Sequence, residues 1–180
     1  MAENSDTSPA GSNQSEQTEP PRLMIQTQYI KDLSFENPRA PATLDQSQNQ
    51  QRPAIAVRVD VRAQPLQDTR YEVAVQLNVD AKAGDDAVFV LELTYAGVFQ
   101  LMNIPKDSLQ PLLLVECPRL LFPFARRIVA DATRDGGFPP LMIDPIDFVA
   151  LYRQRQQQAQ AAAQAATASG DHGQQTSAAN

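Results

Sequence analysis

Large apolar residues recur at every second position in three stretches of the chain, 23–36, 55–62 and 71–80. Successive side chains of a β-strand point to opposite faces, so this period of two predicts three strands, each with one apolar and one polar face. Strands of this kind are typical of antiparallel sheets, which commonly leave one face to water.

The polar face of the first predicted strand carries two acids. Asp32 and Glu36 lie on this face, whereas Leu33 and Phe35 lie on the apolar one. The strand ends at Pro38, because proline has no N–H for the next ladder hydrogen bond.

A fourth predicted strand, residues 88–99, is apolar on both faces. One face carries Phe89, Leu91, Leu93 and Tyr95, and the other carries Val88, Val90, Glu92 and Thr94. One four-stranded sheet and two helices cannot cover both of these faces, so we expect a second subunit to cover what remains. Gly97 within the strand indicates a bulge or the close approach of another backbone.

A long helix is predicted from Pro118, because proline suits the first helical turn, and Cys117 or Glu116 would then be its N-cap. Its apolar positions define one stripe: Leu121, Phe124, Ala125, Ile128 and Ala132. Pro123 lies inside this helix, so we expect a kink or a restart there. The glycine pair at 136–137 ends the helix.

The segment 138–143 joins this helix to a second one. It contains two prolines and cannot be helical, and its apolar side chains either pack into the core or cover an apolar groove. Asp144 is the expected N-cap of the second helix, with Asp147 in its first turn. The apolar positions of the second helix are Phe148, Leu151 and Tyr152.

Composition divides the chain into three parts. Residues 1–22 are almost free of large apolar side chains and predict a disordered tail, whereas the Gln/Ala-rich residues 153–180 predict a helix that frays before Gly170 and then a second disordered tail. The part between them, 23–152, is predicted to be an α+β domain: a four-stranded antiparallel sheet with two C-terminal helices packed on one face. Its loop 39–53 is long enough to indicate a functional role.

Charge and targeting signals favour a soluble protein of the cytoplasm. The formal net charge of −6 argues against nucleic acid as a partner and favours a basic partner. The acidic, polar N-terminus has no apolar h-region, and no apolar run is long enough to cross a bilayer. Cys117 is the only cysteine, which rules out an internal disulfide and fits a reducing compartment.

Signals for catalysis are weak. The only histidine, His172, lies in the predicted C-terminal tail, so we expect no histidine-based triad, general base or metal site. Asp131 and Asp135 are interpreted as charges on a helix surface, and Asp144 and Asp147 as acids at a helix start. The favoured interpretation is a non-enzymatic binding protein without cofactor or metal, whose apolar surfaces accept extended segments of other chains. A small carboxylate-dependent hydrolase is the less favoured alternative.

Three motifs resemble the bacterial protein-export chaperone family SecB, and the resemblance covers residues 25–152. The motifs are Lys31-Asp-Leu-Ser-Phe-Glu-Asn-Pro38, Cys117-Pro-Arg-Leu-Leu-Phe-Pro-Phe-Ala-Arg126 and Gly137-Phe-Pro-Pro-Leu-Met-Ile-Asp-Pro-Ile-Asp-Phe148. The resemblance implies a homotetramer, a dimer of dimers in which each dimer contributes an eight-stranded antiparallel sheet. It also implies that the protein binds unfolded precursor proteins in apolar grooves and delivers them to the motor ATPase SecA, without cofactor or chemical reaction, and meets the membrane only through SecA.

The resemblance further implies roles for individual residues. The SecA-binding positions correspond to Asp32, Glu36 and Glu92, with Val90 as an apolar neighbour. The positions at the subunit interface correspond to Leu91, Leu93 and Tyr95. The expected precursor groove consists of Phe35, Phe122, Phe138, Leu141 and Ile143. A SecB-like protein can instead serve a toxin–antitoxin system as the chaperone of an antitoxin, and the joint presence of the three acids favours the export role.

Overall fold

The computed structural model describes residues 19–44 and 52–170. The strands are β1 (Arg22–Glu36), β2 (Ala54–Pro65), β3 (Arg70–Ala83) and β4 (Asp86–Met102); the helical segments are η1 (Ala42–Leu44), α1 (Lys106–Pro111), η2 (Leu112–Glu116), α2 (Cys117–Asp135) and α3 (Phe148–Gly170). Most of the predicted N-terminal tail, the middle of the loop 39–53 and residues 171–180 lie outside the described residues.

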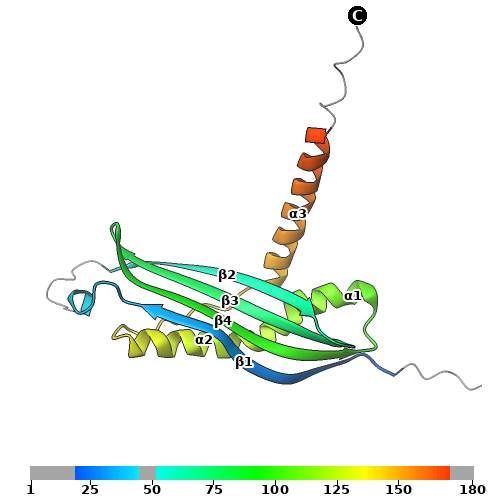
Figure 1. Ribbon diagram of the computed structural model, residues 1–180, viewed down its shortest axis with the longest axis horizontal. Helices are drawn as coiled ribbons and strands as arrows, with labels where there is room; N and C mark the ends of the chain where they lie inside the picture. Colours follow the sequence, from blue (N-terminus) through cyan, green and yellow to red (C-terminus); the bar gives the residue numbers. More distant parts are fainter. Residues whose placement is uncertain (1–18, 45–51, 171–180) are drawn as a thin grey trace, which may run out of the picture.

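The four strands form one antiparallel sheet in the order β1-β4-β3-β2, so β1 and β2 are its edges. The helix α2 lies along one face of this sheet (Figure 1). We call this the inner face and the opposite one the outer face. The predicted α+β class and the antiparallel sheet are confirmed.

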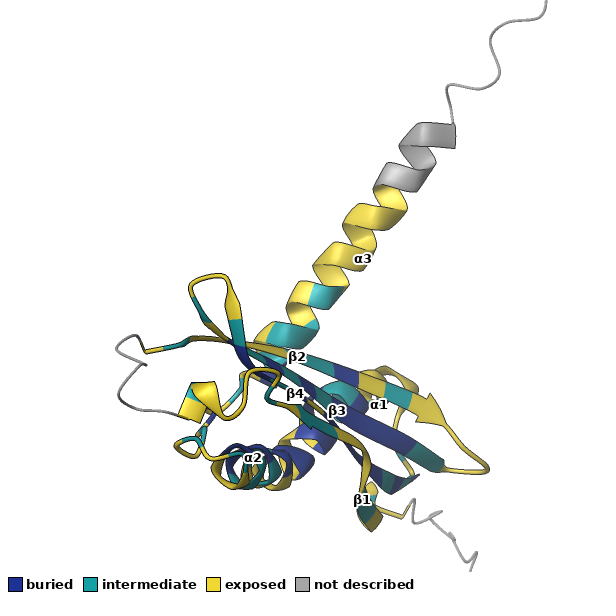
Figure 2. Cartoon of the chain, turned by 60° about the vertical axis from the view of Figure 1, so that its left-hand side comes forward, coloured by how far each residue is buried: buried dark blue, intermediate teal, exposed yellow. Residues whose placement is uncertain are grey.

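The inner face of the central strands forms the core. The side chains of Val73, Val75, Leu77 and Val79 on β3 have no exposed surface. They alternate with Gln76 and Asn78 on the outer face, so the period of two in the sequence correctly predicts which side chains face the core, although Glu72 and Ala74 on the outer face are buried as well. Figure 2 shows the contrast between the buried central strands and the exposed edge strand β1.

Gly97 on β4 marks the closest approach of α2 to the sheet. A Cβ atom at this position would lie 2.9 Å from Leu121 Cδ2, closer than real Cβ contacts come. The pairing of β4 with β1 and with β3 is regular at Gly97. Of the two alternatives, close approach is therefore correct and a bulge is wrong.

The helical segment begins earlier than the sequence predicts. α1, η2 and α2 follow one another directly, and Glu116 has helical backbone angles (φ −75°, ψ −45°), so it is not the cap of a new helix. The short helix α1 opens this segment. In the π-helical η2 the Cys117 N–H donates to Leu112 O, five residues back, and this wider turn lets Pro118 lie inside a continuous helical segment.

The buried face of α2 is rotated from the predicted stripe. Leu121 and Ala125 are fully buried as expected, but Phe124 is 45% exposed, and the remaining buried positions include Phe122, Val129 and Thr133. Pro123 does not restart the helix, since α2 runs without interruption to Asp135.

The end of α2 follows the prediction. Gly137 has φ +88°, which glycine adopts without strain, and Phe138 N–H donates to Thr133 O while Gly137 N–H donates to Arg134 O. These bonds satisfy carbonyl groups that the helix end leaves free.

The predicted N-cap of α3 is wrong by three residues. Asp144 lies in a segment without regular structure, and α3 begins at Phe148. Asp147 is the N-cap, because its Oδ1 accepts hydrogen bonds from the N–H groups of Val149 and Ala150, each at 3.0 Å.

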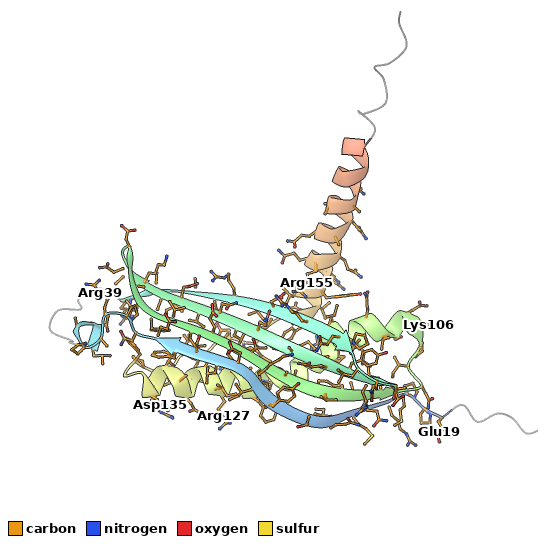
Figure 3. All side chains as sticks on the ribbon, viewed as in Figure 1. Glu19, Arg39, Lys106, Arg127, Asp135 and Arg155 are labelled. Carbon is orange, nitrogen blue, oxygen red and sulfur yellow. The ribbon has the colours of Figure 1, made fainter. Side chains whose placement is uncertain are left out.

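Only the first turns of α3 join the core. Phe148 is 1% exposed and packs edge-on against Phe122, with ring centroids 5.9 Å apart. Arg155 extends from α3 to β2, where it forms an ion pair with Asp60 and donates to Val61 O (Figure 3). Beyond this anchor the helix projects away from the sheet and is exposed as far as its side chains are described (Figure 2). The helix ends at Gly170.

Candidate functional site

The outer face of the sheet gathers three acids at the edge formed by β1 and β4. Glu92 on β4 lies opposite Ser34 on β1, and Ser34 stands between Asp32 and Glu36 on the same face of its strand. All three carboxylates are exposed, and the half-buried Val90 lies opposite Glu36. The structure thus brings together the four residues expected at the SecA-binding site.

These carboxylates are not neutralised by the protein itself. Within 19–44 and 52–170, no ion pair reaches Asp32, Glu36 or Glu92. Arg58, on the same face, pairs with Asp80 at 2.8 Å instead. Three uncompensated negative charges on one exposed face attract and orient a basic partner.

A β-bulge lies directly beside the acids. Ile30 pairs with Tyr95 and Asp32 with Thr94, so Lys31 is an extra residue without its own partner on β4. Because of this bulge, the adjacent residues Lys31 and Asp32 both face the outer side, where they line the same hollow.

This outer-face hollow has a volume of about 540 Å³ and extends from the acids to β2. Seven of its nine lining residues have polar side chains: Lys31, Asp32, Arg62, Ala63, Gln64, Glu72, Ala74, Gln76 and Thr94. Ala74 and, beside it on β4, Ala96 are too small to fill the space above the sheet, so side chains from β1 can reach across to β3.

Glu72 is the central group of the hollow. Its carboxylate accepts hydrogen bonds from Lys31 Nζ at 2.6 Å and from Gln64 Nε2 at 2.5 Å, and it also interacts with the Tyr29 hydroxyl. The bond from Lys31 lowers the pKa of Glu72 despite its burial, and the same bond raises the pKa of Lys31. Burial and the neighbouring Glu72 charge raise the pKa of Tyr29.

The residues expected in the precursor groove fall into two groups. Phe35 and Phe138 are half-buried and belong to an aromatic cluster with Phe89, whose ring centroid lies 5.6 Å from that of Phe35 and 4.9 Å from that of Phe138. Leu141 is also half-buried, and its N–H donates to Thr133 Oγ1 at 2.9 Å. Leu44, 41% exposed, packs at Gly137 next to this cluster.

The other two expected groove residues belong to the core. Phe122 is 6% exposed and Ile143 is 8% exposed, because both pack between α2, the first turn of α3 and the sheet. Both side chains face the core in this protomer, and their part in a precursor groove stays a prediction.

The expected interface residues are also buried within one protomer. Leu91 and Leu93 are 0% and 1% exposed, and Tyr95 is 8% exposed with its ring stacked near that of Phe124. Odd-numbered residues of β4 face α2, so Leu91 and Leu93 lie beneath this helix within one protomer. Their place at a subunit interface stays a prediction.

Exposed apolar side chains gather along β1 and the nearby side of α2, and Ile55 and Val57 on β2 are exposed as well. Ile25, Ile30 and Leu33 are 37–48% exposed, and Leu120 and Phe124 on α2 are 42% and 45% exposed. Phe124 lies over Tyr95, which pairs with Ile30, so the two sets of side chains meet. An edge strand with such apolar side chains is a site for association with another chain.

The carboxylates considered for hydrolysis are otherwise engaged or isolated. Asp131 pairs with Arg134 at 3.1 Å and with Arg127 at 3.8 Å on the surface of α2. No group of three or more His, Cys, Asp or Glu side chains in the described part of the chain is placed to hold a metal. Cys117 is fully buried, and burial raises its pKa to about 12.

None of the helices in the described ranges is both long and apolar enough to span a membrane.

Comparison with known proteins gives one consistent result. The family model described as preprotein translocase subunit SecB matches residues 16–159. The protein-export protein SecB of Parvibaculum lavamentivorans is 52% identical over 157 residues, covering 87% of this chain and 92% of the relative. That of Afipia carboxidovorans is 60% identical over 135 residues, covering 75% of this chain and 83% of the relative.

A solved structure shares the fold at low sequence identity. The SecB-like chaperone of Mycobacterium tuberculosis, in complex with a peptide from the HigA1 antitoxin, superposes with a TM-score of 0.58 at 15% identity. The alignment covers 69% of this chain and 91% of that one.

Proposed function

Since the chain belongs to the SecB family, whose members are protein-export chaperones, we propose that it binds unfolded precursor proteins and delivers them to the SecA motor. The supporting observation is the group of three unpaired acids on the outer face, well separated from the apolar surfaces on the inner side. Such a separation lets one molecule hold an apolar client and a charged partner at the same time.

SecA would be recognised by charge. Asp32, Glu36 and Glu92 together present three carboxylates over a short distance on the sheet, and Val90 adds an apolar contact opposite Glu36. A basic segment of SecA would bind here with a fast, salt-dependent association.

Precursor segments would bind through apolar contacts at the aromatic cluster. Phe35, Phe138 and Leu141 retain exposed surface, and Leu44 extends that surface at the C-terminal end of α2. Contacts of this kind are tolerant of sequence, which suits a chaperone that accepts many unfolded chains.

The functional unit would be a homotetramer in the cytoplasm. The exposed apolar side chains of β1 and α2 would form contacts between subunits, because many of the large apolar groups that one protomer leaves uncovered gather there. Tyr95, which lies beneath Phe124, would support this surface from below.

The export role is favoured over the antitoxin role. The relatives above 50% identity are named as export proteins, whereas the likeness to the antitoxin chaperone is at 15% identity and concerns the fold. The ion pairs of Asp131 with two arginines likewise disfavour hydrolysis.

The proposal is tested with the triple variant D32N/E36Q/E92Q. Its affinity for purified SecA, measured by isothermal titration calorimetry, should fall about tenfold or more, because three interface charges are removed while side-chain size is kept. Binding of an unfolded precursor should not change.

The matched control removes equal charge elsewhere. D68N/D85N/D107N neutralises three exposed acids outside the outer-face cluster and should bind SecA as the unmodified protein does. Equal effects of both triple variants would mean that net charge alone matters and would contradict a SecA site at the acids.

A further inference from the structure

The β-bulge in β1 creates an electrostatic problem beside the three acids. It turns Lys31 to the same face as Asp32, its neighbour in sequence. Asp32 lies next to this lysine on the same strand. Glu92 lies diagonally opposite on β4, two residues from Thr94 on the same face, at a separation that a long side chain can span. An ammonium group there would pair with these carboxylates and compete with a basic partner.

The structure shows Lys31 directed elsewhere. Its Nζ lies 2.6 Å from Glu72 Oε1, so the side chain crosses β4 and ends at β3. Ala96 and Ala74 leave this path open, since neither side chain rises above the sheet.

Glu72 is suited to holding the ammonium group. It is the only buried acid of the described residues, with its side chain 8% exposed, and two further donors, Gln64 and Tyr29, fix its carboxylate. A buried carboxylate with such partners strongly favours a nearby cation, because an unpaired charge there is costly.

We propose that Glu72 is a positioning residue for partner binding: it holds Lys31 in the outer-face hollow and so keeps Asp32, Glu36 and Glu92 free for a basic segment of the partner. This inference rests on the proposed SecA site. This role predicts other effects than a purely stabilising ion pair would. If Lys31 competes for the three acids, removing Lys31 leaves SecA binding intact, whereas removing Glu72 weakens it.

Three variants separate these roles: E72Q, K31M and the double variant K31M/E72Q. E72Q frees the lysine and should weaken SecA binding about three- to fivefold, the range of one exposed ion pair. K31M should bind SecA at least as tightly as the unmodified protein, because it removes a positive charge beside the acids. The double variant should bind like K31M, so that removing the lysine rescues the loss.

The single variants control for each other, since both break the Lys31–Glu72 ion pair. Each is checked for folding by circular dichroism and for binding of an unfolded precursor. If E72Q does not fold, E72D keeps the charge but withdraws the carboxylate from Lys31 and should weaken SecA binding in the same direction.

Equal weakening by K31M and E72Q, or no weakening by E72Q or E72D, would overturn the inference. The triple acid variant in the same titration distinguishes this failure from failure of the proposed function. If D32N/E36Q/E92Q binds SecA weakly but E72Q does not, only the inference is wrong. If the triple variant binds normally, the SecA site and the inference both fail.

Discussion

At the scale of single residues, alternation along the strands predicts the face of each acid correctly. Asp32, Glu36 and Glu92 lie on the outer face because strand side chains alternate, and no tertiary information is needed to place them there. Lys31 and Glu72 were missed. Their contact depends on a bulge and on two alanines of neighbouring strands, and alternation within one strand shows neither.

The Glu72 ion pair predicts a pH-dependent stability. The pKa of Glu72 is lower in the folded protein than its usual value of 4.5, so its contribution is complete above the unfolded pKa and is lost as pH falls through the folded pKa. E72Q should therefore lower the free energy of unfolding by about 1 kcal/mol at pH 7. The difference from the unmodified protein should shrink below about pH 4.

Urea unfolding at pH 7 and below pH 4 measures this difference. E116Q is the matched control, because Glu116 pairs with Arg119 at 2.8 Å but both side chains are nearly half exposed. Its effect should stay within about 0.5 kcal/mol. If E72Q lowered the free energy of unfolding equally at both pH values, the charge on Glu72 would not be what stabilises the protein.

At the scale of elements, all four strands and the two long helices were predictable, but helix boundaries were less so. Pro118 favours a helix start in sequence, yet the π-helical η2 places it inside a continuous segment. The core face of α2 was rotated in the prediction, because Phe124 and Phe122 are equally apolar and only the contact with the sheet at Gly97 decides between them.

The start of α3 gives a test between two acids. D147A should destabilise the protein by about 1 kcal/mol, because Asp147 accepts the hydrogen bonds of Val149 and Ala150 at the helix start. D144A should change the stability by less than about 0.5 kcal/mol, because Asp144 is exposed and lies before the helix. Thermal unfolding of both variants measures the difference. A larger loss of stability in D144A than in D147A would indicate that Asp144 is the N-cap after all.

At the scale of the whole molecule, the sequence showed that one protomer has more apolar surface than it can bury, and the structure locates exposed apolar side chains on strands other than β4. Residues 88–95 are apolar on both faces, yet β4 lies in the middle of the sheet, where its own chain covers most of that surface. Many of the exposed large apolar side chains are on the edge strand β1 and on α2, and Ile55 and Val57 are exposed on the other edge strand, β2. Strand order is a long-range property, and the residues of β4 alone do not reveal it.

The mass of the purified protein in solution, measured by light scattering with and without an equimolar reduced, unfolded precursor, tests the central claim most directly. The protein should form a particle of about four protomers that takes up the unfolded chain and ignores the same chain when folded. A monomer that is indifferent to unfolded chains would contradict both the assembly and the chaperone function proposed for its apolar surfaces.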